Sequence, residues 1–365
     1  MKSLIDITDL SETELRGLMD TACDIIAHLG EYCEKCRGRK LATLFFEPST
    51  RTRLSFEAAM LELGGGVIGF SDADCSSVSK GESLADTARV IGCYADIIAM
   101  RHPKDGAALL ASMNAGVPLI NAGDGGHCHP TQTLADLLTV YRAKGGFDGL
   151  TVGFCGDLKY GRTVHSFINA LARYANIKIV LISPPELCLP EYIKTGVMAR
   201  AGMEWREAGS IEEAIPELDV LYMTRIQRER FGNSDGYSEL ETAFVLDAKK
   251  MKSAKPDMCV LHPLPRVDEI NTDVDPDPRA KYFEQVKNGK YMRMALILHL
   301  LAHAAEQGGS PASAPEAQGL ICANERCVTR GERGAEQLFR RNADGSFTCL
   351  YCESELRTSA GLHND

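Results

Sequence analysis

One stretch of the chain combines residue types that bind anions. Residues 41–66 read LATLFFEPSTRTRLSFEAAMLELGGG, which predicts a strand, a turn at Glu47-Pro48, and a helix that opens at Ser49 and ends before Gly64. The start of this helix would offer backbone N–H groups, hydroxyls and a guanidinium to one anion, and a phosphate suits that geometry. The side chains concerned are Ser49, Thr50, Arg51 and Thr52. The pattern alone leaves a second interpretation open, a plain helix cap by Ser49 or Thr50 beside a solvated arginine.

Four cysteines near the end of the sequence form a second chemical group. Cys322-x4-Cys327 and Cys349-x2-Cys352 are two close pairs, and the connection between them contains a turn signal at Asn342–Gly345. Four thiolates suit a tetrahedral Zn²⁺ ion. A segment of about 36 residues is too small to be stabilised by apolar burial alone, whereas structural zinc contributes about 10–16 kcal/mol in small peptides. We therefore expect a structural zinc ion that holds this module together.

The remaining sequence predicts the elements that must position these groups. Short apolar runs bounded by turn residues indicate buried strands and alternate with helical patterns, which is typical of parallel sheets covered by helices. The predicted strands are Leu41–Phe46, Asp96–Met100, Pro118–Asn121, Thr151–Cys155, Lys178–Ile182, Asp219–Met223 and Cys259–Leu261. Leu134, Leu137, Leu138 and Tyr141 recur at helical spacing, and Arg162–Tyr174 and Tyr291–Glu306 predict two further helices.

The fold class that follows is α/β, with two doubly wound parallel-sheet domains and a small zinc-bound C-terminal module. We expect a first domain over residues 1–130, completed by a returning helix over 288–306, and a second domain over 131–287. Residues 307–319, rich in small residues and proline, predict a linker. The zinc module would span residues 320–357.

Composition excludes several classes of function. The formal net charge is -10, with 44% hydrophobic and 25% charged residues, which argues against a broad electrostatic surface for nucleic acid or anionic membrane. The start MKSLIDITDL lacks the features of a signal peptide, and no run of about 18 apolar residues predicts a membrane span. We expect a cytoplasmic protein with reduced thiols. Five arginines of the zinc module leave a nucleic-acid ribbon or a contact with an acidic protein surface open: Arg326, Arg330, Arg333, Arg340 and Arg341.

Residues 48–53, Pro-Ser-Thr-Arg-Thr-Arg, resemble the carbamoyl-phosphate signature of the transcarbamylase family. Further motifs appear in the family's order, so that the resemblance extends over about residues 1–306. They are DADCSSVSKGESLADT at 72–87, MRHP at 100–103, HPTQT at 129–133, GDLKYGRTVHS at 156–166, TRIQRER at 224–230 and HPLPRVDEI at 262–270. The four-cysteine segment resembles the zinc domain of the separate regulatory chain that accompanies some aspartate carbamoyltransferases.

The resemblance implies a carbamoyl-phosphate site and names its residues. Phosphate would be bound by Ser49, Thr50, Arg51, Thr52 and Arg101, with Ser76 and Lys80 reaching in from a neighbouring subunit. His129 would polarise the carbamoyl oxygen together with Thr52 and Arg101, as an oxyanion hole does. The carbamoyl NH₂ group would be held by Gln132 and the backbone of Leu264. The catalytic set is thus Arg51, Thr52, Lys80, Arg101, His129 and Gln132, and no cofactor is required for the chemistry.

The second substrate implied is L-aspartate. Arginine's planar fork matches a carboxylate, which suits Arg162 and Arg225, with Gln227 as a neutral helper and Lys80 contributing. Glu47 and Arg230 resemble family residues that position these arginines. Pro263 occupies the place where ornithine-specific members typically carry a cysteine, which leaves ornithine carbamoyltransferase, and a catalytically silent scaffold, as the alternatives. The resemblance further implies a homo-oligomer, a trimer at minimum and possible pairing of two trimers, with no nucleic-acid or membrane partner.

Overall fold

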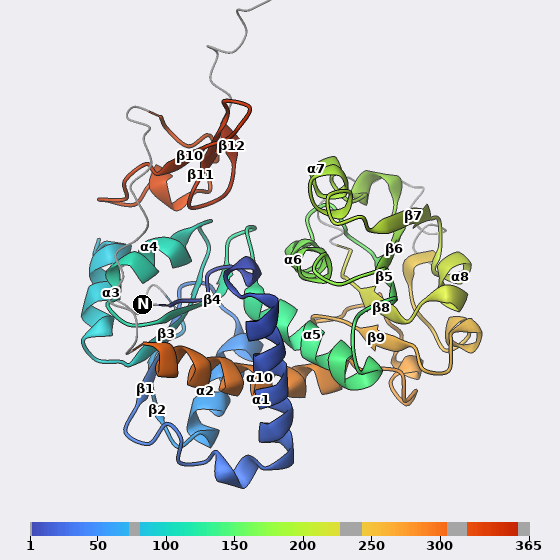
Figure 1. Cartoon of the computed structure of the whole chain (residues 1–365), viewed down its shortest axis with the longest axis horizontal. Coiled ribbons are helices and arrows are strands. Elements are labelled where there is room, and N and C mark those ends of the chain that lie inside the picture. The colour runs from blue at the N-terminus through green and yellow to red at the C-terminus, as the bar shows by residue number, and fades with distance from the viewer. Residues whose placement is uncertain (1, 73–80, 227–242, 305–319, 357–365) are drawn as a thin grey trace, which may run out of the picture. The chain divides into compact units, whose positions relative to one another are not determined.

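The computed structural model describes residues 2–72, 81–226, 243–304 and 320–356, and they form two compact units (Figure 1). The first unit comprises Met1–Leu10, Asp20–Thr131 and Arg293–Asp365, and the second comprises Ser11–Met19 and Gln132–Met292. The long helix α10, Tyr282–His303, passes from the second unit to the first at Arg293. The first half of α1, Glu12–Ala27, belongs with the second unit, a placement that the sequence analysis did not foresee.

The first unit is built on a parallel sheet with the strand order β2-β1-β3-β4. Helices α2, Thr50–Glu62, α3, Leu84–Gly92, and α4, Ala107–Asn114, follow β1, β2 and β3 in the chain. The central strands β1 and β3 are almost entirely buried, as expected of a sheet with helices on both faces. The four strands are β1 Lys40–Phe45, β2 Gly66–Phe70, β3 Ile97–His102 and β4 Leu119–Asp124.

The second unit has a five-stranded parallel sheet in the order β7-β6-β5-β8-β9. Its strands are β5 Thr151–Cys155, β6 Lys178–Ile182, β7 Glu204–Ala208, β8 Val220–Met223 and β9 Cys259–Leu261. The helices of this part of the chain are α5 Pro130–Lys144, α6 Arg162–Leu171, α7 Glu191–Ile193 and α8 Ile211–Ala214. Apolar side chains from the sheet and from α8, among them Ile182, Leu221 and Ile211, share one core.

Two strands of the parallel sheets were missed by the sequence analysis, as were the three short strands of the C-terminal module, and β2 and β7 lie at an edge of their sheets. β2 has the sequence GVIGF and is only half-buried, while β7 reads EWREA and is largely exposed. The other two edge strands, β4 and β9, are buried and were found, so the exposure of β2 and β7, which need no continuous apolar run, explains why they were missed. The pattern that identified the buried central strands therefore could not identify these two.

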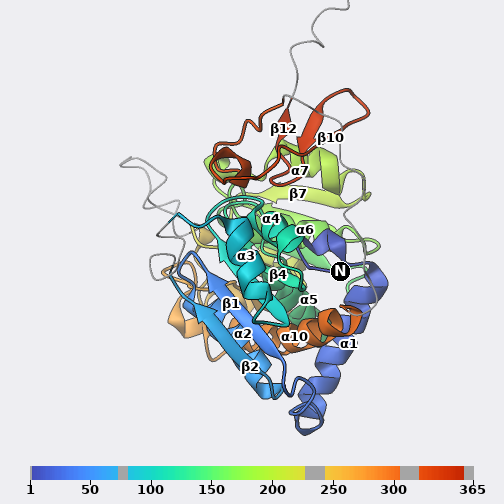
Figure 2. The same cartoon turned by 90° about the vertical axis from the view of Figure 1, so that its left-hand side faces the viewer.

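The C-terminal module consists of three short antiparallel strands in the order β10-β11-β12. Figure 2 shows this module from a second side. These strands are β10 Phe339–Arg341, β11 Phe347–Cys349 and β12 Glu355–Leu356. The module is part of the first unit, and it shares a hydrophobic cluster with α4, to which Val328, Phe339 and Tyr351 contribute.

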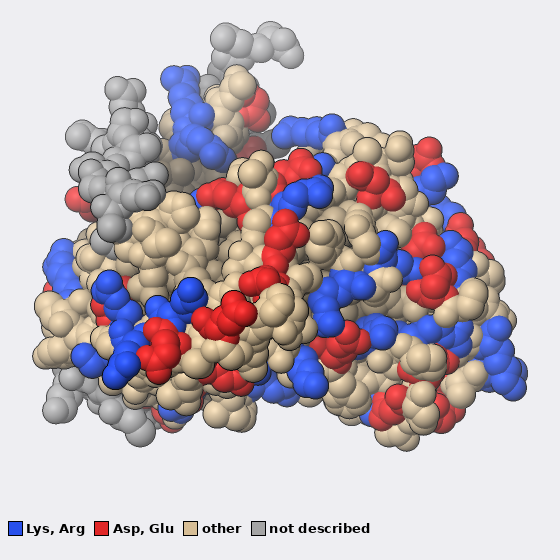
Figure 3. Space-filling model, turned by 60° about the horizontal axis from the view of Figure 1, so that its bottom comes forward, with Lys and Arg blue, Asp and Glu red and all other residues tan. Residues whose placement is uncertain are grey.

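Acidic and basic side chains are interspersed over the face drawn in Figure 3. Exposed ion pairs among the described residues include Arg37 with Glu34 and Arg206 with Glu217. Among the helices that the structure describes, none is long and apolar enough to cross a membrane. Exposed pairs of this kind contribute little to stability, about 0–1 kcal/mol each.

Candidate active site and metal centre

The predicted anion-binding helix begins at the carboxyl end of a central strand. β1 ends at Phe45, and α2 starts at Thr50 with Ser49 as its N-cap residue. The Ser49 hydroxyl makes no capping hydrogen bond to the helix, so the plain-cap interpretation is not what the structure shows. Thr52 is buried within the first turn. A helix start that is not capped by its own side chain directs backbone N–H groups outward, which is the arrangement that suits an anion.

Two arginines gather beside this helix start. Arg101 lies in β3 and pairs with Phe45 of β1 in the sheet register, which brings it to the same end of the sheet. Burial, and then the charge of Arg101, lower the pKa of Arg51 below its ordinary value. Arginine nevertheless stays protonated at neutral pH. Two guanidinium groups that repel each other in a partly buried place are stabilised by an anion between them.

Glu47 holds Arg101 in place. Its Oε1 accepts a hydrogen bond from Nη2 of Arg101 at 2.7 Å, and the Arg101 side chain is 12% exposed. The Nε atom of Arg101 is buried and has no hydrogen-bond partner among the described residues. Arg53, by contrast, forms an ion pair with Glu57 one turn along α2 at 2.7 Å. Arg51 and Arg101 are therefore the arginines positioned to bind a ligand, whereas Arg53 forms an ion pair within α2.

His129 follows the next strand of the same sheet. It comes after β4 and directly before α5, and it is buried. The Thr131 hydroxyl lies 3.5 Å from its Nδ1 atom. β1, β3 and β4 are neighbours in a parallel sheet, so the ends that carry Ser49, Arg101 and His129 lie on one edge. In open α/β sheets, ligands bind at the carboxyl ends of the strands.

The second unit repeats this arrangement with different residues. Arg162 is the first residue of α6, which follows β5, and Arg225 lies two residues after the end of β8. Leu264 follows β9, the neighbour of β8, and has a left-handed backbone with φ of 50°. A residue other than glycine in this region costs on the order of 1–2 kcal/mol, and such residues cluster at functional sites. Gln132 begins the part of α5 that belongs to this unit.

Four of the predicted site residues lie outside the described residues: Ser76, Lys80, Gln227 and Arg230. The other site residues of the first unit all lie at or beyond the carboxyl ends of β1, β3 and β4, and those of the second unit lie beyond β5, β8 and β9, apart from Gln132 in α5.

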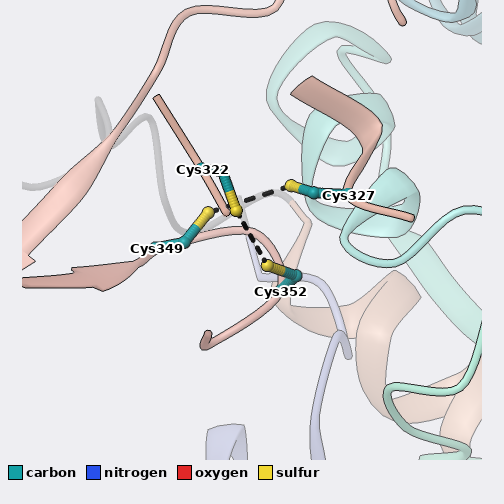
Figure 4. A group of neighbouring side chains, drawn as sticks. All are labelled: Cys322, Cys327, Cys349 and Cys352. Atoms are coloured by element: carbon teal, nitrogen blue, oxygen red, sulfur yellow. Dashed lines mark hydrogen bonds between the residues drawn. The ribbon is translucent and has the colours of Figure 1, made fainter. Parts of the chain in front are cut away.

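The four C-terminal cysteines converge on one point (Figure 4). All four sulfur atoms lie within 4.8 Å of one another, and all four residues are buried. The Sγ atoms of Cys322 and Cys352 are 3.5 Å apart, and those of Cys327 and Cys349 are 3.9 Å apart. A tetrahedral ion with Zn–S bonds of about 2.3 Å places its sulfurs about 3.8 Å from one another. The geometry thus fits a four-coordinate metal ion.

Without an ion, burial opposes thiolate formation at Cys322. Burial, and then the adjoining Cys352 thiol, raise the pKa of Cys322 to about 12. A divalent cation removes this penalty, because it favours the deprotonated ligands. Thiolate ligands in this buried site would need a cation to compensate their charge, and the donor set points to a metal that thiolates prefer, such as zinc.

Comparison with known proteins gives the family. The carbamoyl-P binding domain of aspartate/ornithine carbamoyltransferases matches residues 2–142, and the Asp/Orn binding domain of the same enzymes matches residues 148–300. The chain belongs to the aspartate/ornithine carbamoyltransferase family. Residues 317–360 match the metal binding domain of the aspartate carbamoyltransferase regulatory chain. The resemblance seen in the sequence is confirmed for both parts of the chain.

Relatives within this transcarbamylase family are close. The chain is 61% identical over 301 residues to an aspartate carbamoyltransferase catalytic subunit of Lachnoclostridium phytofermentans, covering 82% of this chain and 98% of that protein. It is 59% identical over 300 residues, with the same shares covered, to the corresponding subunit of Clostridium acetobutylicum. Both alignments leave part of this chain uncovered, and the metal binding domain match falls at its C-terminal end.

Solved structures of transcarbamylases confirm the fold of the two α/β units. The catalytic subunit of the M. jannaschii aspartate transcarbamoylase is 46% identical and has a TM-score of 0.80, covering 84% of this chain and 100% of that one. The Trypanosoma cruzi aspartate transcarbamoylase in complex with carbamoyl phosphate is 39% identical with a TM-score of 0.77, covering 82% and 95%. The fold class expected from the sequence is therefore confirmed.

The metal-bearing module of this transcarbamylase packs on its own carbamoyl-phosphate domain. Asp105 is the centre of the contact: its N–H donates to the Arg326 carbonyl at 3.0 Å, its carbonyl accepts from Val328 at 2.9 Å, and its carboxylate accepts from Asn324 at 2.9 Å. Gly106 follows, and a Cβ atom there would lie 2.4 Å from the Tyr351 side chain. This surface was not identified from the sequence, since a single Asp-Gly pair carries no signal of docking.

We predict that replacing one ligand unfolds the module. Cys349→Ser removes a thiolate from the site, and structural zinc contributes about 10–16 kcal/mol to folding in small peptides. The variant should carry much less than one zinc ion per chain by elemental analysis, and residues 320–356 should become sensitive to protease. Cys33→Ser, which changes an exposed thiol elsewhere, is the control and should keep its metal. A fully loaded Cys349→Ser chain would contradict the assignment of the ligands.

Proposed function

We propose that the chain is an aspartate carbamoyltransferase, which transfers the carbamoyl group of carbamoyl phosphate to the amine of L-aspartate in pyrimidine biosynthesis. The products are N-carbamoyl-L-aspartate and phosphate. The observation that carries this proposal is the pair Arg51 and Arg101 at the uncapped start of α2, in a chain of this family. Relatives at 61% and 59% identity are aspartate carbamoyltransferase catalytic subunits.

The residues of the first unit would bind and activate carbamoyl phosphate. Arg51, Arg101, the hydroxyls of Ser49, Thr50 and Thr52 and the helix N–H groups hold the phosphate, each charge-assisted bond contributing about 1.5–3 kcal/mol. His129, Thr52 and Arg101 stabilise the negative charge that develops on the carbamoyl oxygen. Ser76 and Lys80 would be supplied by a neighbouring subunit. Glu47 keeps Arg101 oriented through the ion pair described above.

Residues of the second unit would bind the amine substrate and the carbamoyl NH₂ group. Arg162 and Arg225, assisted by Gln227 and positioned by Arg230, match the two carboxylates of aspartate. Gln132 and the backbone carbonyl of Leu264 accept hydrogen bonds from the NH₂ group. The amine of aspartate must lose a proton as it attacks, since its ordinary pKa is about 8 or above, and the departing phosphate is a chemically suitable acceptor.

Aspartate is favoured over ornithine as the substrate. Ornithine carries one carboxylate and a side-chain ammonium group, so a second arginine would repel it. The sequence has Pro263 where ornithine-specific members typically have cysteine. Incubation of the purified chain with carbamoyl phosphate and either amino acid, followed by mass spectrometry, tests the proposal. Carbamoyl aspartate is the expected product; citrulline from ornithine, or no product from either, would contradict the proposal.

The assembly we propose is a trimer of catalytic domains, and pairing of two trimers through the metal-bearing modules extends it. A site that needs Ser76 and Lys80 from a neighbour cannot be complete in a single chain. The metal is proposed to be Zn²⁺, because the four cysteine ligands are the set that zinc prefers. A cytoplasmic location, expected from the sequence, stays a prediction.

We predict that His129→Ala slows turnover severely. The loss of one donor to a developing oxyanion typically costs about 100- to 1,000-fold in kcat. The decrease should appear in kcat measured with both substrates saturating, because the imidazole is assigned to the transition state. A His129→Ala enzyme with a near-normal kcat would remove this residue from the reacting centre.

Mixing two inactive variants tests the shared site. Lys80→Ala and Arg51→Ala chains should each be strongly impaired, and refolding them together should restore part of the activity, since a mixed interface contains one site with both wild-type residues. The readout is carbamoyl aspartate formation by mixed trimers verified by native mass spectrometry. Verified mixed trimers without recovered activity would argue against sharing.

A further inference from the structure

A fully buried carboxylate lies behind the carbamoyl-binding residues of the second unit. Asp136 of α5 is 0% exposed. Its Oδ1 atom accepts from the Nε2 atoms of Gln132 at 2.7 Å and Gln285 at 2.5 Å, and its Oδ2 atom accepts from the Tyr222 hydroxyl at 2.9 Å. Burying a carboxylate is costly unless it is well hydrogen-bonded. These three donors, which come from α5, α10 and β8, compensate that cost.

The carboxylate determines which way both glutamine amides face. A carboxylate accepts hydrogen bonds and does not donate them, so the NH₂ ends of Gln132 and Gln285 must point at Asp136. The carbonyl oxygens of the two amides consequently point away from it. For Gln285, the structure shows the partner of that oxygen: Oε1 accepts from the backbone N–H of His262 at 3.0 Å. For Gln132, the carbonyl oxygen would then be the end available to the NH₂ group of the proposed substrate.

The same network reaches Leu264 through His262. The Leu264 N–H donates to Nδ1 of His262 at 2.7 Å, and this requires that the proton of the ring be on Nε2. Nε2 then donates to Glu269 at 2.7 Å. Burial raises the pKa of Glu269. The hydrogen bonds that Glu269 accepts from His262 and from backbone N–H groups have the larger combined effect, so its pKa is lowered overall. His262 is thereby fixed at both ring nitrogens, and Leu264 presents its carbonyl oxygen rather than its N–H.

The network also extends to the beginning of α6. The Thr163 hydroxyl forms a hydrogen bond to Tyr222, and Thr163 is the residue after Arg162. Burial, followed by the charge of Asp136, raises the pKa of Tyr222 well above its ordinary value, so the phenol stays a neutral donor. We call Asp136 and its three donors, Gln132, Gln285 and Tyr222, the hub. The hub connects Thr163, the neighbour of Arg162, with Gln132 and, through His262, with Leu264.

We propose that Asp136 is a positioning residue for donor selectivity. By directing the amides of Gln132 and Gln285, and through His262 the backbone of Leu264, it provides two carbonyl oxygens that accept hydrogen bonds from an NH₂ group. The hub selects a carbamoyl phosphate against an acyl phosphate of the same shape that carries a methyl group. This inference rests on the proposed carbamoyl roles of Gln132 and Leu264.

Acetyl phosphate is the probe for this selectivity, because a methyl group replaces the NH₂ group and cannot donate. The full-length enzyme and its variants are compared by the KM for carbamoyl phosphate and by the inhibition constant of acetyl phosphate as a competitor. Asp136→Asn replaces an acceptor oxygen by an NH₂ group, which cannot accept hydrogen bonds from Gln132, Gln285 and Tyr222. The Gln132 amide is then no longer held with its NH₂ end toward residue 136. We expect the KM for carbamoyl phosphate to rise about 10- to 100-fold, while the inhibition constant of acetyl phosphate changes by less than about 3-fold.

Tyr222→Phe provides a milder change if Asp136→Asn does not fold. It removes only the hydroxyl that anchors Oδ2, and the KM for carbamoyl phosphate should rise about 3- to 10-fold with acetyl phosphate inhibition unchanged. The matched control is Tyr282→Phe. Tyr282 is also fully buried and its hydroxyl bonds to a carboxylate, that of Asp275, but it is outside the hub. The control should leave both constants unchanged, even if it lowers the melting temperature.

The outcomes separate this inference from the proposed function. If Asp136→Asn or Tyr222→Phe weakens both ligands in proportion, or leaves the KM for carbamoyl phosphate unchanged, the positioning role is wrong. Gln132→Ala examines the underlying assignment. If Gln132→Ala abolishes selectivity while the hub variants retain it, only the inference fails; if Gln132→Ala itself retains selectivity, the proposed role of Gln132 fails as well.

Discussion

The repulsion between Arg51 and Arg101 is the constraint on which the first unit depends. Arg101 and the start of α2, which carries Arg51, lie at the carboxyl ends of neighbouring strands, and burial, followed by the charge of Arg101, lowers the pKa of Arg51. An anion bound between the two guanidinium groups would attract both of them and so offset their repulsion. The sheet, the start of α2 and Glu47 keep the arrangement in place before any ligand binds, which is the preorganisation that binding and catalysis require.

In the second unit the central charge is negative rather than positive. Here a buried negative charge, Asp136, is surrounded by donors, and its effect is to turn acceptors outward. In the C-terminal module four buried sulfur atoms converge, and a bound cation would compensate the charge of their thiolate forms. In each case a charge that would be unfavourable alone is retained because a specific partner offsets it.

The buried strands and the phosphate motif could be predicted from the sequence because their signals are local. Leu41–Phe46 and Thr151–Cys155 are apolar runs bounded by turn residues, and the corresponding strands β1 and β5 were found within a residue or two. The edge strands β2 and β7 lack such a run and were missed. Asp136 was not identified as important, because its partners Tyr222 and Gln285 are 86 and 149 residues away in sequence.

The contact between the C-terminal module and the first unit was also not predicted, because its residues are far apart in the sequence. Asp105 and Asn324 are 219 residues apart, and neither has a pattern around it that predicts the contact. The cysteine ligands, in contrast, were predictable, since their spacing alone indicates a metal site. Sites formed by residues close together in the sequence could be predicted from motifs, whereas contacts between distant segments could be identified only from the structure.

The most direct test of the account is a calorimetric titration with inorganic phosphate at constant ionic strength. It compares the wild-type chain with Arg51→Ala and with Arg53→Ala, whose side chain is engaged by Glu57. The account predicts that Arg51→Ala weakens phosphate binding at least about tenfold, which corresponds to about 1.4 kcal/mol, while Arg53→Ala binds as the wild type does. Equal phosphate affinity in the wild type and Arg51→Ala would contradict it.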